Sequence, residues 1–141
     1  MPKRVRVLIP VLLALMLFGC AKAPVSNPPV VPTPPQVLVA QMCQAGAHTA
    51  ALASQGFIAA HQAKALDDAA FATIARAIQA ADKFFRDATT ETASGDTWPQ
   101  MRVKIAGLAA GSVISQTVSD PALQADLDAI NKAIQNILGV Q

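Results

Sequence analysis

The sequence predicts an all-α fold, an antiparallel bundle of three or four helices. From Val37 onward, apolar residues recur at steps of three and four, and no alternating run long enough for a strand appears. Aromatic residues make up only 4% of the chain, so the core must be built from small aliphatic side chains, which suit closely packed helices. We expect the bundle to occupy residues 37–141, after two N-terminal segments, 1–19 and 20–36.

Residues 1–19 have the order of charge and hydrophobicity that is typical of a secretory signal. Lys3, Arg4 and Arg6 open the segment, and an apolar run interrupted by Pro10 continues to Phe18. The positive end of such a segment stays in the cytoplasm while the apolar run enters the translocon. Because the run is shorter than the about 20 residues needed to span a bilayer, we expect it to be removed.

The end of this segment is similar to a known processing motif. Leu17-Phe18-Gly19-Cys20 resembles the lipobox of bacterial lipoproteins, which has Leu three residues before the cysteine and a small residue directly before it. The resemblance implies a diacylglycerol on the Cys20 thiol, cleavage before Cys20 by signal peptidase II, and frequent acylation of the new α-amino group. Phe18 departs from the Ala, Ser or Thr that is more usual there. The resemblance covers about the first 20 residues only.

The motif implies a place in the cell. A protein with several acyl chains on Cys20 is held stably at a membrane surface of the cell envelope. Ala21, rather than Asp, follows the cysteine, and in enterobacterial lipoproteins this favours the periplasmic face of the outer membrane over the inner membrane. No cofactor is expected beyond the lipid. An ordinary secretory signal with a chance cysteine, or an uncleaved anchor, is the alternative.

Removal of the signal also changes the charge of the chain. Of the 11 basic residues, Lys3, Arg4 and Arg6 leave with the signal, so eight basic residues face nine acidic ones. A nucleic-acid-binding domain would instead show a basic patch. We therefore expect no nucleic-acid partner.

Residues 20–36 predict a tether between the lipid and the bundle. Six prolines lie between residues 24 and 35, and proline favours extended, polyproline-II-like backbone. At about 3.1 Å per residue, residues 23–36 could lift the bundle on the order of 40 Å above the lipid. A Pro-rich ligand for a partner domain is the alternative, which is less favoured because no basic residue flanks a PxxP core.

Two helices are predicted in the first part of the bundle. The first begins near Val37 and is interrupted by Gly56, with an inward seam of small and apolar residues, Leu38, Met42, Ala45, Thr49 and Leu52. The second is expected from about Ile58 to Thr90, with an inward face of Ile74, Ile78, Ala81 and Phe85 that Leu66 and Ala70 extend backwards.

Two further helices follow a polar break at residues 93–97. One is expected from Pro99 to Gln116, and its inward positions are Met101, Ile105, Leu108 and either Ser112 or Val113. Ser119-Asp120-Pro121 combines a capping oxygen with a proline that the first turn tolerates, so it predicts the start of the last helix. Its apolar stripe is Leu123, Leu127, Ile130, Ile134 and Ile137, and Gly139 is the expected stop.

The sequence offers little for catalysis or metal binding. His48 and His61 are the only histidines, and they lie thirteen residues apart across the predicted break, not at the i, i+4 spacing of a metal pair. The chain has no Ser-centred elbow, glycine-rich phosphate loop or CxxC motif. We therefore assign no catalytic residue and no metal ligand.

The acidic residues are expected to form a solvated helix surface. Asp67 and Asp68 are adjacent, so on a helix they point about 100° apart and do not converge, and Lys64 is four residues from Asp68. Two further i, i+4 ion pairs are predicted, Asp82 with Arg86 and Lys83 with Asp87.

Three residues are candidates for contact with another chain. Cys43 is the one cysteine left after lipidation of Cys20, and in an oxidising compartment it is either buried in the core or bridged to a second chain by a disulfide. Phe84 lies off the predicted stripe and Trp98 lies in the polar break. These two aromatics either cover the end of the bundle or contact a partner.

Three classes of function are compatible with these features. The favoured class is a non-catalytic envelope lipoprotein whose helical domain binds an envelope protein or associates with itself. The second is a phage- or prophage-encoded surface lipoprotein, for superinfection exclusion or lysis, although the domain is larger and more helical than the small Pro-rich outer-membrane spanins. An enzyme with an unrecognised site is the least favoured.

Overall fold

The computed structural model describes residues 34–141, and the predicted signal segment and Cys20 lie outside this range. The described residues form four helices and no strand: α2 (Pro35–Gln62), α3 (Asp68–Thr92), α4 (Trp98–Leu108) and α5 (Pro121–Leu138). The predicted all-α class is therefore confirmed for this part of the chain. α2 begins two residues before the expected boundary at 37, because Pro35 is tolerated in a first helical turn.

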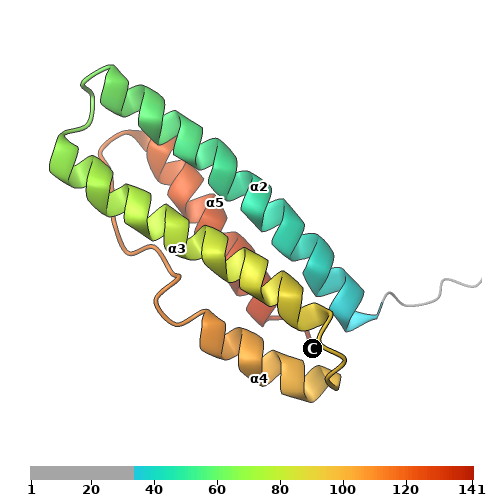
Figure 1. Cartoon of the computed structure of the whole chain (residues 1–141). Coiled ribbons are helices and arrows are strands. Elements are labelled where there is room, and N and C mark those ends of the chain that lie inside the picture. The colour runs from blue at the N-terminus through green and yellow to red at the C-terminus, as the bar shows by residue number, and fades with distance from the viewer. Residues whose placement is uncertain (1–33) are drawn as a thin grey trace, which may run out of the picture. The chain divides into compact units, whose positions relative to one another are not determined.

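The helices form a bundle in which α2, α3 and α5 are the long members. α2 lies along both α3 and α5, and it runs antiparallel to both of them (Figure 1). α4 is shorter and packs mainly on α3 (Figure 1). The start of α2, the start of α4 and the end of α5 all lie at the same end of the bundle (Figure 1).

α2 buries a different face from the one predicted. Its buried residues are Val39, Cys43, Gly46, Ala50, Ala53 and Phe57, a stripe shifted by one position from the expected seam. Leu38 and Leu52, which the sequence placed inward, are 40% and 54% exposed. A shift of one residue rotates the helix by about 100°. Both stripes are apolar, so the sequence pattern of this helix does not distinguish them.

The break between the first two helices also differs from the prediction. α2 continues through Gly56 to Gln62, and Gly56 faces α5, where an added Cβ would lie 3.4 Å from Asp126 Oδ2. The turn occurs instead at residues 63–67, where Lys64 has a positive φ of 59°. Asp67 then caps α3 by accepting a hydrogen bond from the Ala70 amide at 2.8 Å. Lys64 and Asp67 are therefore turn and cap residues rather than part of a helix surface.

The inward faces of α3 and α5 agree with the sequence prediction. Ile74, Ile78, Ala81 and Phe85 of α3 are buried, and so are all five predicted residues of α5, Leu123, Leu127, Ile130, Ile134 and Ile137. Asp120 caps α5 by accepting from the amides of Ala122 and Leu123. The predicted stop at Gly139 is confirmed, because α5 ends at Leu138.

α4 is shorter than the predicted helix from Pro99 to Gln116. It ends at Leu108, and Gly111 adopts a positive φ of 80°, which directs the chain into an irregular connection that leads to α5. Within this connection Ser112 is buried and Val113 is 49% exposed, so Ser112 is the inward residue of the two. Ile114 is also buried there, and its amide and carbonyl are both bonded to the Asn131 side chain at 2.8 Å.

Candidate interaction surface

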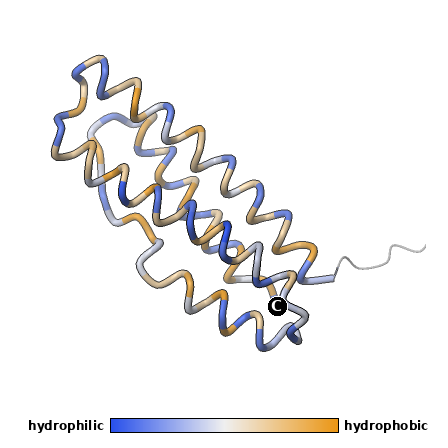
Figure 2. Tube along the Cα trace, in the orientation of Figure 1, coloured by the Kyte–Doolittle hydropathy of each residue, from blue (hydrophilic) through white to orange (hydrophobic). Residues whose placement is uncertain are grey.

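The outer side of α2 is the most unusual surface of the described domain. None of the 28 residues of α2 is Asp, Glu, Lys or Arg. The formal charges of residues 34–141 lie on α3, α4, α5 and the connections instead. Hydrophobic positions recur along the whole of α2 (Figure 2). A helix at the surface of a soluble domain normally carries charged residues on its water side, so this one is suited to being covered.

Exposed apolar residues occur at both ends and in the middle of this helix. Val37, Leu38, Leu52 and Ile58 are each between 40% and 54% exposed. Neutral polar residues, Gln41, His48, Gln55 and Gln62, lie exposed between them. We call the exposed residues of this side the α2 face: Val37, Leu38, Gln41, Gln44, Ala45, His48, Ala51, Leu52, Gln55, Ile58, Ala59 and Gln62.

A groove lies at one end of the bundle, between the start of α4 and the end of α5. Its volume is about 330 Å³, and Trp98, Val103, Leu138 and Val140 are among its lining residues. Val103 is 74% exposed, the largest value among the exposed large apolar residues of the described part. Arg102 also lines the groove, so a charge lies among these apolar side chains.

Trp98 is placed differently from its prediction. It is the first residue of α4, not part of a loop, and its ring is partly buried against the core. Its indole N–H is buried, and no described residue accepts a hydrogen bond from it. Trp98 therefore lines the groove and covers this end of the core, which is one of its two predicted roles.

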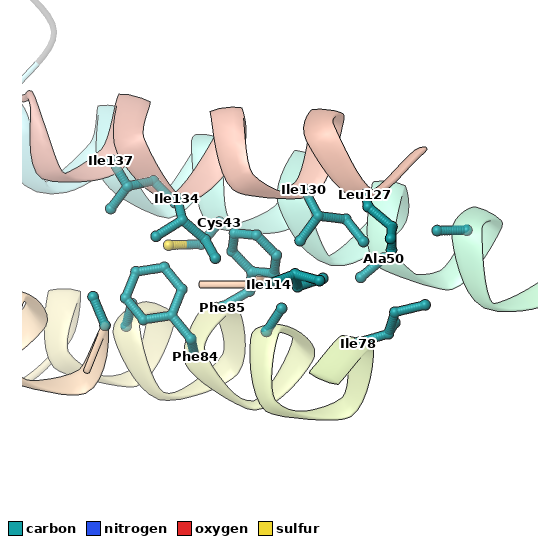
Figure 3. Packing of buried hydrophobic residues seen from close by; sticks show 14 of the residues in the cluster. Cys43, Ala50, Ile78, Phe84, Phe85, Ile114, Leu127, Ile130, Ile134 and Ile137 are labelled. Atoms are coloured by element: carbon teal, nitrogen blue, oxygen red, sulfur yellow. The ribbon is translucent and has the colours of Figure 1, made fainter. Parts of the chain in front are cut away.

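Phe84 is buried, so the folded domain does not present it to a partner, which was one of its two predicted roles. Its exposed fraction is 1%, and its ring packs edge-on against Phe85 with centroids 5.4 Å apart (Figure 3). Leu108 and Ser112 line a shallow hollow together with Phe84. The end of α4 and the turn after it thus cover this side of α3, which the pattern of α3 alone could not indicate.

Cys43 is buried among the core side chains (Figure 3). Burial raises the pKa of its thiol to about 11, although a hydrogen bond with Thr89 acts in the opposite direction. A thiol with no exposed surface cannot reach a second chain while the bundle is folded. Of the two interpretations of Cys43, this placement favours a core residue over an intermolecular disulfide.

The two histidines lie far apart on α2. His48 is exposed in the middle of the helix. His61 lies near the end of α2, whereas the predicted second helix from about Ile58 would place it near the start of that helix. At about 1.5 Å per residue they are about 20 Å apart along the axis. Among the described residues, no group of three His, Cys, Asp or Glu is arranged to hold a metal.

His61 joins the end of α2 to the start of α3. Its ring stacks on Phe71 with centroids 4.3 Å apart, and its Nδ1 lies 3.2 Å from the Leu66 carbonyl oxygen. Its Nε2 lies 3.5 Å from a carboxylate oxygen of Asp68. The sequence pattern did not indicate this arrangement, because residues 58–90 were predicted to form a single helix. These contacts hold the turn between α2 and α3 closed.

Ion pairs at the surface join or brace the other helices. The predicted pairs Lys83 with Asp87 and Arg86 with Asp82 are both present on α3. Lys104 of α4 pairs with Asp96, and it lies 3.4 Å from a Glu91 carboxylate oxygen. The hydrogen bond from Lys104 lowers the pKa of the Asp96 carboxyl. These groups fasten α4 to the end of α3.

No family model, curated protein or solved structure matches this chain. Among the helices of residues 34–141, none is both long enough and apolar enough to cross a membrane.

Proposed function

We propose that this chain is a lipid-anchored protein of the cell envelope, whose helical domain acts by binding a protein surface and not by catalysis. The anchor is the lipid on Cys20, residues 20–36 are the spacer, and the bundle presents the binding surface. The outer membrane, at its periplasmic face, is the proposed location, because Ala21 follows the cysteine.

The proposal that the helical domain binds a protein surface rests on the α2 face. An uncharged helix of 28 residues leaves apolar side chains in water on a domain whose other helices carry charges. Leaving apolar area in water costs roughly 25 cal/mol for each Å² that a partner would otherwise cover. A protein surface that covers α2 would recover this free energy.

The anchor half of the proposal rests on the order of features in residues 1–20. A basic start, an apolar run, a small residue and a cysteine follow one another, as in lipoprotein precursors. Two or three acyl chains bind a membrane stably, whereas one chain binds only marginally. The anchor would hold the α2 face within reach of other envelope proteins.

Replacing Cys20 tests the anchor. Cells that express the full chain are labelled with palmitate, and the wild-type protein should take up the label and sediment with membranes. Cys20→Ser should take up no label and accumulate as the uncleaved precursor, because the thiol is the acceptor of the first lipid. Cys43→Ser is the matched control and should be labelled normally. Label on the Cys20→Ser protein would show that the anchor is elsewhere.

A further inference from the structure

The α2 face contains a stripe of regularly spaced side chains that alternate in size. Leu38, Ala45, Leu52 and Ala59 follow one another at intervals of seven residues, and all four are exposed. A seven-residue interval returns to nearly the same side of a helix, and it is the repeat with which two helices pack along each other. Gln41, His48 and Gln55 lie beside this stripe and are also exposed.

We propose that the α2 face binds the α2 face of a second copy of this chain, with the two helices antiparallel. In that orientation Leu38 comes opposite Ala59 of the second copy, and Ala45 comes opposite Leu52 of the second copy. Each large side chain then meets a small one, which is how ridges and grooves of two helices interdigitate. A two-fold axis passes near His48, midway along the stripe.

The alternative orientation fits the same residues less well. In a parallel pair, each Leu would meet the same Leu of the second copy and each Ala would meet the same Ala. Contacts between two leucines would hold the helices apart, and voids would remain at Ala45 and Ala59. Because packed interfaces tolerate few voids, the antiparallel orientation is preferred.

The absence of charge on α2 selects a second copy over other classes of partner. A two-fold interface brings a surface against itself, so any charge near the axis would lie near its own copy. α2 has no Asp, Glu, Lys or Arg to repel itself in this way. A helix that binds anionic lipid or nucleic acid carries Lys and Arg on the binding side, and α2 carries neither.

The size of the α2 face predicts a weak pair in free solution. A helix of 28 residues is about 42 Å long and about 10 Å wide, so the contact covers on the order of 400 Å² on each copy. That is about half of the roughly 800 Å² that a stable interface buries on each partner. Anchoring both copies in one membrane raises their effective concentration. This step rests on the proposed function, because it requires that both copies are lipid-anchored, and it specifies a second copy of the chain as the protein partner.

Disulfide crosslinking of the full chain in its own membranes tests the pairing. Single cysteines are introduced on the α2 face and oxidised. His48→Cys should crosslink to itself, because it lies near the two-fold axis. Leu38→Cys and Ala59→Cys should each give little dimer alone, and a strong dimer when the two variants are expressed together. Self-crosslinking of Leu38→Cys without the mixed product would show a parallel pair and overturn the proposal.

Two controls accompany this experiment. The parent chain reports any background from Cys43, which is buried, and Gln79→Cys reports random collisions, because Gln79 is exposed on α3. If His48→Cys gives no more dimer than Gln79→Cys, or crosslinks to a different protein instead, α2 does not pair with itself. Palmitate labelling is measured on the same samples, so a failed anchor is recognised separately from a failed pairing.

A charge-rescue pair of variants gives an independent test. Leu52→Glu and Ala45→Lys each place a charge in the apolar stripe, and each should abolish the crosslinked dimer formed by His48→Cys. The double variant should restore it, because in the antiparallel pair the new Glu lies opposite the new Lys of the second copy. Both positions are exposed, so the circular dichroism of each variant should remain helical. A double variant as weak as the single ones would contradict the antiparallel pairing.

Discussion

At Gly46, α2 lies directly against a side chain of α3. A Cβ built on Gly46 would overlap the edge of the Phe85 ring, and Phe85 itself is fully buried. The glycine thus makes room for the largest kind of side chain in this core. Gly56, ten residues later in the same helix, meets Leu123 and Asp126 only at ordinary contact distances of 3.4 Å or more.

This difference predicts opposite effects for the same substitution at two positions of one helix. Gly46→Ala should lower the free energy of unfolding by about 1–3 kcal/mol, because Phe85 or the backbone must move. Gly56→Ala should leave it unchanged or raise it by about 0.5–1 kcal/mol, because alanine favours helix over glycine. Urea unfolding of both variants measures the effect, and equal stabilities would contradict the close approach at Gly46.

Cys43 contributes a dependence of stability on alkaline pH. Its pKa is about 11 in the folded protein, above the ordinary value of 9.0, because burial disfavours the thiolate. Between about pH 9 and about pH 11 the unfolded chain loses the thiol proton while the folded chain keeps it. The contribution of this group is therefore complete below about pH 9 and is lost as the pH rises toward 11.

The expected result is a fall in the free energy of unfolding across this interval. Each pKa unit of difference between the two states corresponds to about 1.4 kcal/mol. The chain has no tyrosine, so no phenol ionises in the same range. Urea unfolding at neutral and alkaline pH measures the fall, and Cys43→Ala should reduce it. An equal fall in Cys43→Ala would assign the effect to other groups.

At the scale of elements, side chains of α5 hold the connection between α4 and α5: Gln124 accepts a hydrogen bond from the Val118 amide, and Asn131 bonds both backbone groups of Ile114. The Asn131 amide accepts from the Ile114 N–H and donates to the Ile114 carbonyl, so it replaces the backbone partner that a longer helix would have supplied. Ile114 is buried at the same place. This connection leaves the helical path at Gly111 and depends on Asn131 for its position.

Asn131→Ala should therefore loosen this connection. Two backbone groups of Ile114 would lose their partner, which costs about 1–3 kcal/mol for a buried group. The measurements are the free energy of unfolding and the hydrogen exchange of the Ile114 amide, which should become faster. Asn136→Ala is the matched control, because Asn136 is exposed on the same helix, and it should change neither. Unchanged exchange at Ile114 in Asn131→Ala would contradict this role.

At the scale of the whole molecule, residues 34–141 share one buried apolar cluster. Every residue of the buried apolar cluster falls between Val39 and Ile137, and α2, α3, α4 and α5 all contribute to it. Many of these residues are alanines, which bury little area each. The domain has a complete core of its own, although a modest one.

A fragment of residues 34–141 should therefore fold without the signal, the lipid or the tether. Its circular dichroism spectrum should be predominantly helical, and its thermal unfolding should be cooperative, as is usual for small single domains. The full chain purified in detergent is the reference, and the two should unfold at similar temperatures. A disordered spectrum of the fragment would show that the alanine-rich core requires a covered α2 face to fold.

The all-α class, a bundle of three or four helices, and the start and end of α5 could be predicted from the sequence, and so could the inward faces of α3 and α5. These two helices alternate apolar with charged residues, so the charged side marks where water lies. Asp120 and Pro121 likewise act on their own neighbours, and local chemistry of this kind is independent of what packs nearby. In these places the pattern and the fold agree.

Tertiary contacts decided four features that the pattern did not predict. These are the inward face of α2, the continuation of α2 through Gly56, the end of α4 at Leu108 and the burial of Phe84. α2 carries no charge to mark its water side, so Phe85 above Gly46 and Leu123 beside Gly56 select the face that is buried. Phe84 is covered by residues more than twenty positions away, around Leu108 and Ser112. A periodic pattern reports the inward side of a helix only where its outward side is different in polarity, and contacts between distant segments decide the rest.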